Sequence, residues 1–389
     1  MNRHFAGRVL GMQPSPTVAV SDAVRTLHQQ GKDVIDLGGG EPDFPTPEHV
    51  CRAAIEALQA GDTHYVASAG TLQLRTAIAY KLKIDNQIDV DVSSIIVTPG
   101  AKSALFSSVL ALVESGDDVV MFDPGWVSYE PMARVAGADT VRIPLDPAEN
   151  YRISREAIEP HLTPSSRVII VNTPNNPTGR MLTREELTAI AEIAIEHDMI
   201  VISDEIYEKI NYDGNVHVSI GSLPGMAVRT LTVNGFSKAY AMTGWRLGYV
   251  AGPSDIMRQV AKIHSHSVTC ASSFGQAGAA AALEGPQDFI DSMVEAWDRR
   301  RHLIASGLNS VPGFQCPLPE GAFYALPDVS GTGFDGGAVA KRLIDKAGVG
   351  VTPGAAFGDV TSNHIRLSFA NSDSLIESSI ERIRKTFSA

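Results

Sequence analysis

The sequence of 389 residues has few cysteines and no long apolar run. Its three cysteines, Cys51, Cys270 and Cys316, lie far apart and form no CxxC pair, so neither a zinc site nor a disulfide framework is indicated. No apolar stretch approaches the roughly 20 residues of a membrane span. Residues 1–12 contain no sustained apolar segment of the kind that a secretion signal needs. We therefore expect a cytoplasmic protein with no membrane partner.

Basic residues are also in the minority, with 32 Lys and Arg against 44 Asp and Glu and a formal net charge of −12. An acidic chain is repelled by the phosphates of nucleic acids, so no nucleic-acid partner is expected. Any anion that the protein binds must be held by a local cluster of donors. The histidines His4, His197 and His217 show no metal-ligand spacing, and we predict no metal site.

Strand-like and helix-like segments alternate from about Val50 to Glu284. Most strand candidates are short, β-branched and apolar on both faces, which is typical of parallel strands covered on two sides. The strand candidates are Ile95–Thr98, Asp118–Asp123, Thr140–Ile143, Val168–Asn172, Ile200–Ser203, Thr230–Val233 and Leu247–Ala251. Helical patterns such as Ala101–Val113 and Arg184–His197 lie between them, the second behind a capping box at Thr183. This alternation predicts a doubly wound α/β domain with a mostly parallel sheet.

After Glu284 the pattern is that of a smaller α+β domain. Its expected elements are an amphipathic helix at Gln287–Leu308, strands at Phe323–Leu326 and Ile365–Phe369, a helix near Gly337–Ala347 and a final helix. A helix at Ser21–Gln30 and a strand at Val34–Gly38 are expected to fold onto it. Because a chain of this length exceeds what one core usually covers, we expect two unequal domains. The division is an N-terminal arm with part of the small domain (1–46), a large domain (47–286) and a small C-terminal domain (287–389).

Chemically distinctive residues follow several strands of the expected sheet. In an open α/β sheet, ligands bind beyond the carboxyl ends of the strands. The segments there are Pro99–Ala104, Pro124–Tyr129, Thr173–Gly179, Asp204–Tyr207 and the turn that holds Lys238. They would bring an anion-binding turn, an aromatic ring, amides, a carboxylate, a phenol and an amine to one edge of the sheet.

Lys238 is the most informative of these residues. It follows a buried apolar run and stands among glycines and aromatics, so it is well placed to form an imine, and Arg246 can hold an anion nearby. That pair suggests a lysine that carries a phosphorylated aldehyde cofactor. Each residue taken alone has a structural explanation, such as a helix cap for Asp204 or a core position for Tyr207, so the argument rests on the constellation. The segment Leu37–Asp43 lacks the third glycine of a dinucleotide fingerprint, which argues against a Rossmann NAD site.

The motifs of this chain resemble those of the pyridoxal-5′-phosphate (PLP) aminotransferases of fold type I, class I, and within them the bacterial aspartate aminotransferase-like branch. The motifs are Gly40–Pro47, Tyr65 with Gly70 and Leu74–Arg75, Thr98–Lys102, Trp126–Tyr129, Asn172–Gly179, Ser203–Tyr207, Asn234–Tyr249, Gly321–Tyr324, Val351–Gly354 and Ile365–Ala370. The resemblance covers nearly the whole chain. It implies an enzyme that moves an amino group between an L-amino acid and a 2-oxo acid by a ping-pong mechanism.

The resemblance also implies roles for the cofactor-binding residues. Lys238 would hold PLP as an imine and shuttle a proton, and Asp204 would pair with the ring nitrogen. Tyr207 and Asn176 would hydrogen-bond the phenolic oxygen of the cofactor, and Trp126 would stack on its ring. The residues around the phosphate would be Gly100, Ala101, Lys102 and Arg246, with Ser237 a weaker candidate.

Arg366 would bind the substrate α-carboxylate, because the guanidinium fork meets a carboxylate bidentately. Gly40, Trp126 and Asn176 would also contact the substrate. In the family that the chain resembles, Tyr65 reaches the phosphate of the neighbouring subunit, which implies a homodimer with composite sites. The resemblance further suggests a cis peptide bond before Pro177.

The substrate side chain is the least determined feature. A dicarboxylate needs a cation, and Ser265–Phe274 offers no arginine, so Lys102 or a residue from elsewhere must serve. Other candidates for side-chain contacts are Ser15–Thr17, Tyr129 and Ser265–Ser273. L-Aspartate with 2-oxoglutarate is the leading expectation, and alanine, aromatic or other neutral amino acids are the alternatives. A PLP-dependent carbon–sulfur β-lyase would share nearly every cofactor contact, whereas the acidic charge argues against a DNA-binding PLP regulator.

Overall fold

The structure is a computed structural model that describes residues 4–388. Within these residues, seven strands form a central sheet in the order β2-β8-β7-β6-β5-β3-β4. They are β2 (Ile95–Thr98), β3 (Asp118–Asp123), β4 (Asp139–Pro144), β5 (Ser166–Asn172), β6 (Ile200–Asp204), β7 (Thr230–Gly235) and β8 (Gly248–Ala251). All neighbours in this sheet pair in parallel except β8, which is antiparallel to β2 and β7. The predicted mostly parallel, doubly wound sheet is confirmed.

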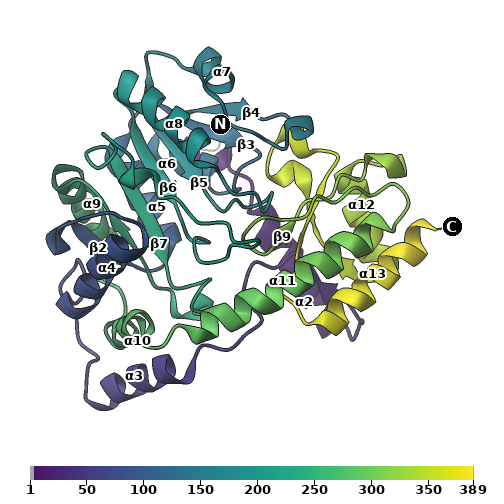
Figure 1. Ribbon diagram of the computed structural model, residues 1–389, viewed down its shortest axis with the longest axis horizontal. Helices are drawn as coiled ribbons and strands as arrows, with labels where there is room; N and C mark the ends of the chain where they lie inside the picture. Colours follow the sequence, from purple (N-terminus) through teal and green to yellow (C-terminus); the bar gives the residue numbers. More distant parts are fainter. Residues whose placement is uncertain (1–3, 389) are drawn as a thin grey trace.

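Helices cover both faces of this sheet (Figure 1). They are α3 (Glu48–Gln59), α4 (Leu72–Asp85), α5 (Ala101–Leu112), α6 (Tyr129–Ala136), α7 (Arg155–Ile158), α8 (Arg184–Glu196), α9 (Ser254–Ser267) and α10 (Ser273–Glu284). Alternate strand residues feed two cores, because successive side chains of a strand point to opposite faces. Ile169 and Val201 join the cluster that includes α8, whereas Ile170 and Ile202 join the cluster that includes α5. The strands are therefore apolar on both faces, as the sequence predicted.

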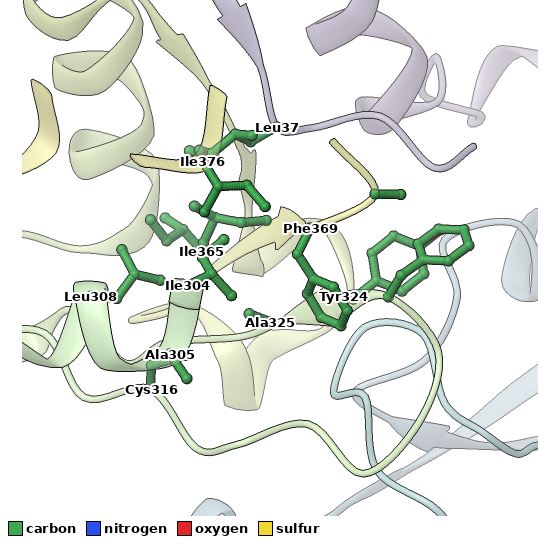
Figure 2. Close-up of a cluster of buried hydrophobic side chains, with 14 of the residues drawn as sticks. Leu37, Ile304, Ala305, Leu308, Cys316, Tyr324, Ala325, Ile365, Phe369 and Ile376 are labelled. Carbon is green, nitrogen blue, oxygen red and sulfur yellow. The ribbon is translucent and has the colours of Figure 1, made fainter. Parts of the chain in front are cut away.

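A second region combines a three-stranded antiparallel sheet, β11-β12-β9, with the parallel pair β1-β10. Its strands are β1 (Ile35–Asp36), β9 (Tyr324–Ala325), β10 (Val349–Gly350), β11 (Thr352–Pro353) and β12 (Ile365–Ser368). Its helices are α2 (Pro16–Gln29), α11 (Asp288–Asn309), α12 (Gly336–Arg342) and α13 (Asp373–Phe387), whereas the short α1 (Gly7–Leu10) contacts α6 beside the central sheet. The long α11 packs against α13 (Figure 1). Figure 2 shows Leu308 of α11 and Ile376 of α13 in the core that forms there with Ile365 of β12.

The pairing of β1 with β10 ties the N-terminal residues to this second region, and domain boundaries after residues 46 and 286 stay a prediction. Two N-terminal elements differ from their predicted bounds. Helix α2 begins at Pro16 rather than Ser21, because proline fits the first turn of a helix. The strand predicted at Val34–Gly38 is limited to β1, because the Gly38 N–H donates to the Asp36 carboxylate (2.8 Å) in a turn that ends the pairing.

Within residues 4–388, no helix combines the length and the apolar character needed to cross a bilayer. Cys51, Cys270 and Cys316 are free thiols. Cis peptide bonds precede Pro124, Pro174 and Pro177, and the sequence predicted the last of these.

Candidate active site

A cleft of about 690 Å³ lies at the carboxyl ends of β5, β6 and β7, the edge at which the sequence predicted a site. Residues of the second region, on β9 and β12, complete its wall. The predicted site residues that line the cleft are Gly40, Ala101, Lys102, Trp126, Asn176, Asp204, Tyr207, Ser237, Lys238, Arg246 and Arg366. Segments far apart in the sequence therefore meet in one cavity of the size that holds small-molecule ligands.

Lys238 lies on the turn after β7 and is partly buried at the cleft wall. Its Nζ donates a hydrogen bond to the Gly40 carbonyl and lies 5.8 Å from the centre of the Tyr207 ring. Burial lowers the pKa of Lys238 to about 8, and the positive charges of Arg366 and Arg246 act in the same direction. An amine with such a pKa can both hold and release a proton near neutral pH.

Asp204 ends β6 and is only 5% exposed. The Tyr129 hydroxyl donates to Asp204 Oδ2 at 2.8 Å, and the Ile206 N–H lies 3.4 Å from Oδ1. Among residues 4–388, no lysine, arginine or histidine forms an ion pair with Asp204. Burial raises the pKa of Asp204 to about 6, although the hydrogen bond from Tyr129 opposes this shift. A buried acid that faces a cleft and forms no ion pair with the described residues suits a ligand that brings a positive charge.

Arg366, on β12, is 2% exposed, and neutral groups hold its guanidinium. Nη1 donates to Asn176 Oδ1 (3.0 Å) and Nη2 donates to the Gly38 carbonyl (2.6 Å). The rings of Tyr324 and Phe357 lie 4.5 and 4.9 Å from its Cζ atom. In the described part of the chain, no carboxylate forms an ion pair with it, and burial lowers the pKa of Arg366. This guanidinium is suited to a ligand carboxylate.

The N-terminus of α5 lies beside Arg246. Gly100, which precedes the helix, has φ = 82°, and a Cβ atom there would stand 2.5 Å from Arg246 Nη2. Glycine therefore lets the guanidinium approach the helix N-terminus closely. Lys102 also lies at this end of the cleft, and its pKa is lowered by burial and by Arg246. Free helix N–H groups with the Arg246 guanidinium make an anion site, and Lys102 adds a second positive charge beside it.

Trp126 and Tyr65 occupy contrasting positions. Trp126 lines the cleft, packs edge-on against Tyr129 (5.3 Å between ring centres) and lies 4.9 Å from Lys102 Nζ. Tyr65 lies in the loop between α3 and α4, is 86% exposed and does not line this cleft. Gly100 also stays outside the lining and acts through its backbone.

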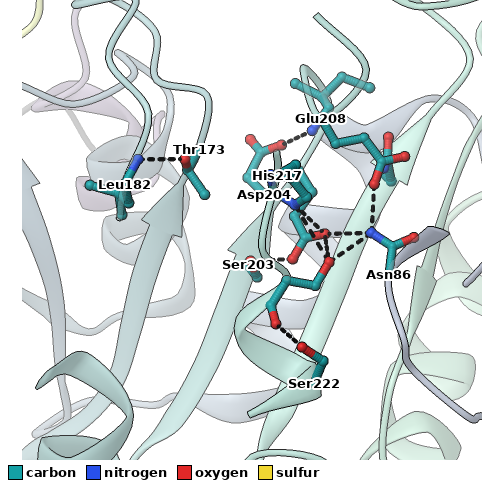
Figure 3. Close-up of polar contacts among 12 residues, drawn as sticks. Asn86, Thr173, Leu182, Ser203, Asp204, Glu208, His217 and Ser222 are labelled. Atoms are coloured by element: carbon teal, nitrogen blue, oxygen red, sulfur yellow. Dashed lines mark hydrogen bonds and ion pairs between the residues drawn. The ribbon is translucent and has the colours of Figure 1, made fainter. Parts of the chain in front are cut away.

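A second group of charged residues is buried behind Asp204 (Figure 3). Glu205 and Glu208 accept hydrogen bonds from Asn86 Nδ2 (3.1 and 2.6 Å), and Lys81 forms an ion pair with Glu208. His217 Nε2 lies 3.0 Å from Glu205 Oε2. Burial alone would raise the pKa of Glu208, but the charges of Lys81 and His217 and the hydrogen bonds from Lys81 and Asn86 together outweigh it, and the pKa falls to about 2. None of these residues lines the cleft.

Comparison with known proteins identifies the family. Residues 32–383 match the family model described as aminotransferase class I and II. The chain belongs to this family. An aspartate aminotransferase of Musicola paradisiaca (strain Ech703) is 45% identical over 383 residues, which are 98% of this chain and 96% of that protein. An aspartate aminotransferase of Bacillus subtilis (strain 168) is 40% identical over 98% of each chain.

The solved structure of an aspartate aminotransferase from Thermus thermophilus with maleate matches with a TM-score of 0.95 at 41% identity, over 99% of this chain and 100% of that one. The protein is therefore an aminotransferase of fold type I, as the sequence predicted. Its reaction moves an amino group between an amino acid and an oxo acid.

Two tyrosines of this aminotransferase have contacts that the sequence did not predict. Tyr129 was a candidate for contact with the substrate side chain; it lines the cleft, and its hydroxyl also donates to Asp204. Tyr324 is known from the sequence only as part of a motif, and its hydroxyl lies 2.8 Å from that of Tyr207. Among the specificity candidates, Thr17, Lys102 and Tyr129 line the cleft, and no residue of Ser265–Ser273 does.

Proposed function

We propose that this aminotransferase binds PLP in the cleft and transfers the amino group of L-aspartate to 2-oxoglutarate in two half-reactions that share one site. One observation carries the proposal: a single cleft joins the amine of Lys238, the unpaired acid of Asp204 and the unpaired guanidinium of Arg366. These are the partners that an aldehyde, a protonated ring nitrogen and a substrate carboxylate require.

The donors present fit PLP. Burial raises the pKa of Asp204, and no side chain of the described residues forms an ion pair with it, so a protonated ring nitrogen would supply the missing partner. The N-terminus of α5 and Arg246 would hold the phosphate, and Trp126 would stack on the ring. Tyr207 and Asn176 would hydrogen-bond the phenolic oxygen. When bound, PLP supplies an aldehyde for the substrate amine and a ring that accepts electrons.

The side chains of the cleft then have separate tasks. Arg366 would orient the substrate through its α-carboxylate, and Gly40 leaves room beside it. Lys238 Nζ would take the proton from the substrate Cα atom and return it, for which a pKa of about 8 is suitable. Asp204 would keep the ring nitrogen protonated by its charge.

Lys102 would bind the distal carboxylate of aspartate. Arg246 and the α5 N–H groups provide for the phosphate, so the Lys102 side chain is available at the cleft wall beside Trp126. The relatives named above are aspartate aminotransferases, and maleate, which accompanies the Thermus thermophilus protein, is a dicarboxylate. Both facts favour a dicarboxylate substrate for this chain.

A panel of half-reactions tests the cofactor and the substrate together. The protein, purified with excess PLP, is mixed with single amino acids while the visible absorbance of the cofactor is followed. We expect L-aspartate to react fastest, and Lys102→Gln to lower the ratio of aspartate to alanine rate constants about 10- to 100-fold, as loss of a charged hydrogen bond predicts. Lys83→Gln is the matched control, because Lys83 on α4 is exposed.

Three results of the panel would contradict the proposal. A protein that shows no visible cofactor absorbance would refute PLP binding in this cleft. A faster reaction with alanine or an aromatic amino acid would refute aspartate as the donor. Release of pyruvate from cystathionine would instead show a carbon–sulfur lyase.

We also propose a homodimer in which Tyr65 completes the neighbouring site. The exposed phenol of Tyr65 lies on a loop that is fixed to α10, where the Ser273 hydroxyl donates to the Asp62 carbonyl at 2.6 Å. Leu72 and Phe274, at the starts of α4 and α10, are 66% and 39% exposed. Exposed apolar side chains around a rigid loop are typical of a surface that a second copy covers.

Hybrid dimers test this arrangement. Tyr65→Ala and Lys238→Ala chains are co-expressed, so that a hybrid dimer carries both substitutions in one site and neither in the other. Random pairing should restore about a quarter of the wild-type activity, since half of the dimers are hybrids with one intact site. If the mixture stays as inactive as Lys238→Ala alone, Tyr65 does not act across subunits.

A further inference from the structure

Tyr324 lies where the two regions of the molecule meet. It is on β9, where it pairs with Ser368 of β12, the strand that carries Arg366. Figure 2 shows it next to Phe369 at the side of the core cluster. The side chain is 1% exposed and still lines the cleft. A buried phenol in this position must place its hydroxyl on a specific partner.

That partner is the other buried phenol of the cleft. The hydroxyl oxygens of Tyr324 and Tyr207 are 2.8 Å apart, and Tyr207 is 4% exposed. In residues 4–388, neither hydroxyl has another hydrogen-bond partner. Each phenol has one proton, and burial raises the pKa of both, so both stay neutral at physiological pH. If Tyr324 donates to Tyr207, the proton of Tyr207 is free to point elsewhere.

The surroundings hold the Tyr324 ring in place. One face lies 4.5 Å from the Arg366 guanidinium carbon, and the Tyr207 ring packs edge-on at 5.7 Å between ring centres. A Cβ atom on Gly40 would stand 2.7 Å from the Tyr324 oxygen, so only glycine permits this close approach. The carbonyl of the same Gly40 accepts the hydrogen bond from Lys238. The Tyr324 side chain therefore has a fixed position relative to Arg366 and to Gly40, whose carbonyl holds Lys238.

We infer that Tyr324 is a positioning residue: its hydroxyl donates to Tyr207 and thereby directs the Tyr207 proton to the phenolic oxygen of PLP. This inference rests on the proposed function, in which Tyr207 contacts that oxygen. Tyr324 itself need not touch the cofactor. It polarises the Tyr207 hydroxyl, because a phenol that accepts a hydrogen bond becomes a better donor.

The visible absorbance of the bound cofactor reports this effect without any turnover. Its colour changes when the covalent link between Lys238 and PLP loses a proton. A hydrogen bond to the phenolic oxygen stabilises the more negative, deprotonated state and so keeps the midpoint pH of the colour change low. Tyr324→Phe removes only the hydroxyl and should raise this midpoint by about half a unit, less than Tyr207→Phe does.

The double variant Tyr207→Phe with Tyr324→Phe separates a direct from an indirect effect. If Tyr324 acts through Tyr207, the double variant has the midpoint of Tyr207→Phe alone. Tyr212→Phe is the control, because it removes a buried hydroxyl that donates to the Ala322 carbonyl (2.6 Å) and does not line the cleft. It should lower the thermal unfolding midpoint and leave the colour change unaltered.

The outcomes distinguish the two proposals. If the wild-type protein shows no pH-dependent cofactor absorbance, the proposed function fails and this inference fails with it. If the wild type shows the colour change and Tyr324→Phe leaves its midpoint unchanged or lowers it, only the role of Tyr324 is refuted. Additive shifts in the double variant would also refute it, because they would mean that Tyr324 acts on the cofactor independently of Tyr207.

Discussion

Two acidic groups lie on either side of the end of β6, and they differ in how their charge is compensated. Asp204 faces the cleft, accepts from Tyr129 and has no ion-pair partner among the described residues, so its pKa rises to about 6. Glu208 points to the other side, where Lys81 and Asn86 hold it and its pKa falls to about 2. Both are buried, at 5% and 7% exposure.

The difference shows how to distinguish an acidic side chain that binds a ligand from one that stabilises the fold. Burial of a charge is costly unless a partner compensates it. For Glu208 the protein supplies the partners, Lys81 and Asn86. For Asp204 the described residues supply no ion-pair partner, and a bound cation would offset the cost of burying its charge. Substitutions on the cleft side, at Asp204 or Lys238, should therefore lower activity without lowering stability. Substitutions on the far side, at Glu208 or Lys81, should lower stability and leave activity nearly unchanged.

Lys238→Ala should have the largest effect on the cleft side. We expect amino transfer to fall below detection, because the variant lacks the amine that would hold PLP and move the substrate proton. Among the described residues that line the cleft, no other lysine lies on the turn after β7. The free energy of unfolding of the cofactor-free protein should change by less than about 1 kcal/mol, since residues kept for function are seldom optimal for stability. Activity assays and urea unfolding measure the two effects. Transfer near the wild-type rate would refute the assignment.

Asp204→Asn should reduce the rate by at least about a thousandfold, which corresponds to about 4 kcal/mol of activation free energy. Asparagine keeps the shape of the side chain but loses the charge that would hold a proton on the ring nitrogen. Single-turnover kinetics with L-aspartate measure the loss. The matched far-side variant is Glu208→Gln, which should keep the rate within a few-fold. Equal rate losses in Asp204→Asn and Glu208→Gln would contradict the claim that only Asp204 serves the reaction.

Lys81→Met should have the largest effect on the far side. It leaves the carboxylate of Glu208 buried without its lysine, and breaking a buried pair in this way costs about 3–5 kcal/mol. Lys83→Met, at an exposed position of the same helix, is the control and should stay within about 0.5 kcal/mol. Urea unfolding measures both variants. A stable Lys81→Met protein with a damaged rate would place this network in the reaction instead.

The contrast also shows how far the sequence predicts this molecule. The seven strands and the edge that carries Asp204 and Lys238 follow from local patterns, because β-branched runs form the strands and parallel strands end at one edge. Partners across long sequence separations do not follow. Tyr129 is 75 residues from Asp204, and Tyr324 is 117 residues from Tyr207. No local pattern states which hydroxyl reaches which acid, because tertiary packing decides it.

The sequence did not predict the buried cluster of Lys81, Asn86, Glu205, Glu208 and His217, for the same reason. Lys81 and Asn86 lie at the end of α4, more than a hundred residues before the carboxylates that they hold. His217 was expected at the surface or satisfied by neighbours, and it is buried against Glu205. The motif Ser203–Tyr207 contains Asp204 and ends one residue before Glu208. It does not tell which of these two acids faces the cleft, because the fold around the end of β6 decides that.

The pH dependence of stability gives the finest test of the comparison. Asp204 has a pKa of about 6 in the folded protein and 3.8 as its ordinary value, so the folded state binds more protons between these values. Its contribution to the stability of the cofactor-free protein therefore falls as the pH rises from about 4 to 6, by up to about 3 kcal/mol. Glu208 has a pKa of about 2 against 4.5, so its contribution is lost as the pH falls from about 4.5 towards 2.

The two acids should thus give unfolding profiles with slopes of opposite sign. Subtracting the urea-unfolding profile of Asp204→Asn from that of the wild type should leave a difference that declines with rising pH. The same subtraction with Glu208→Gln should leave one that climbs. The pH ranges barely overlap, so each variant serves as the control of the other. If both differences change with pH in the same direction, the protein compensates the two carboxylates alike, and Asp204 does not need a cation from the ligand.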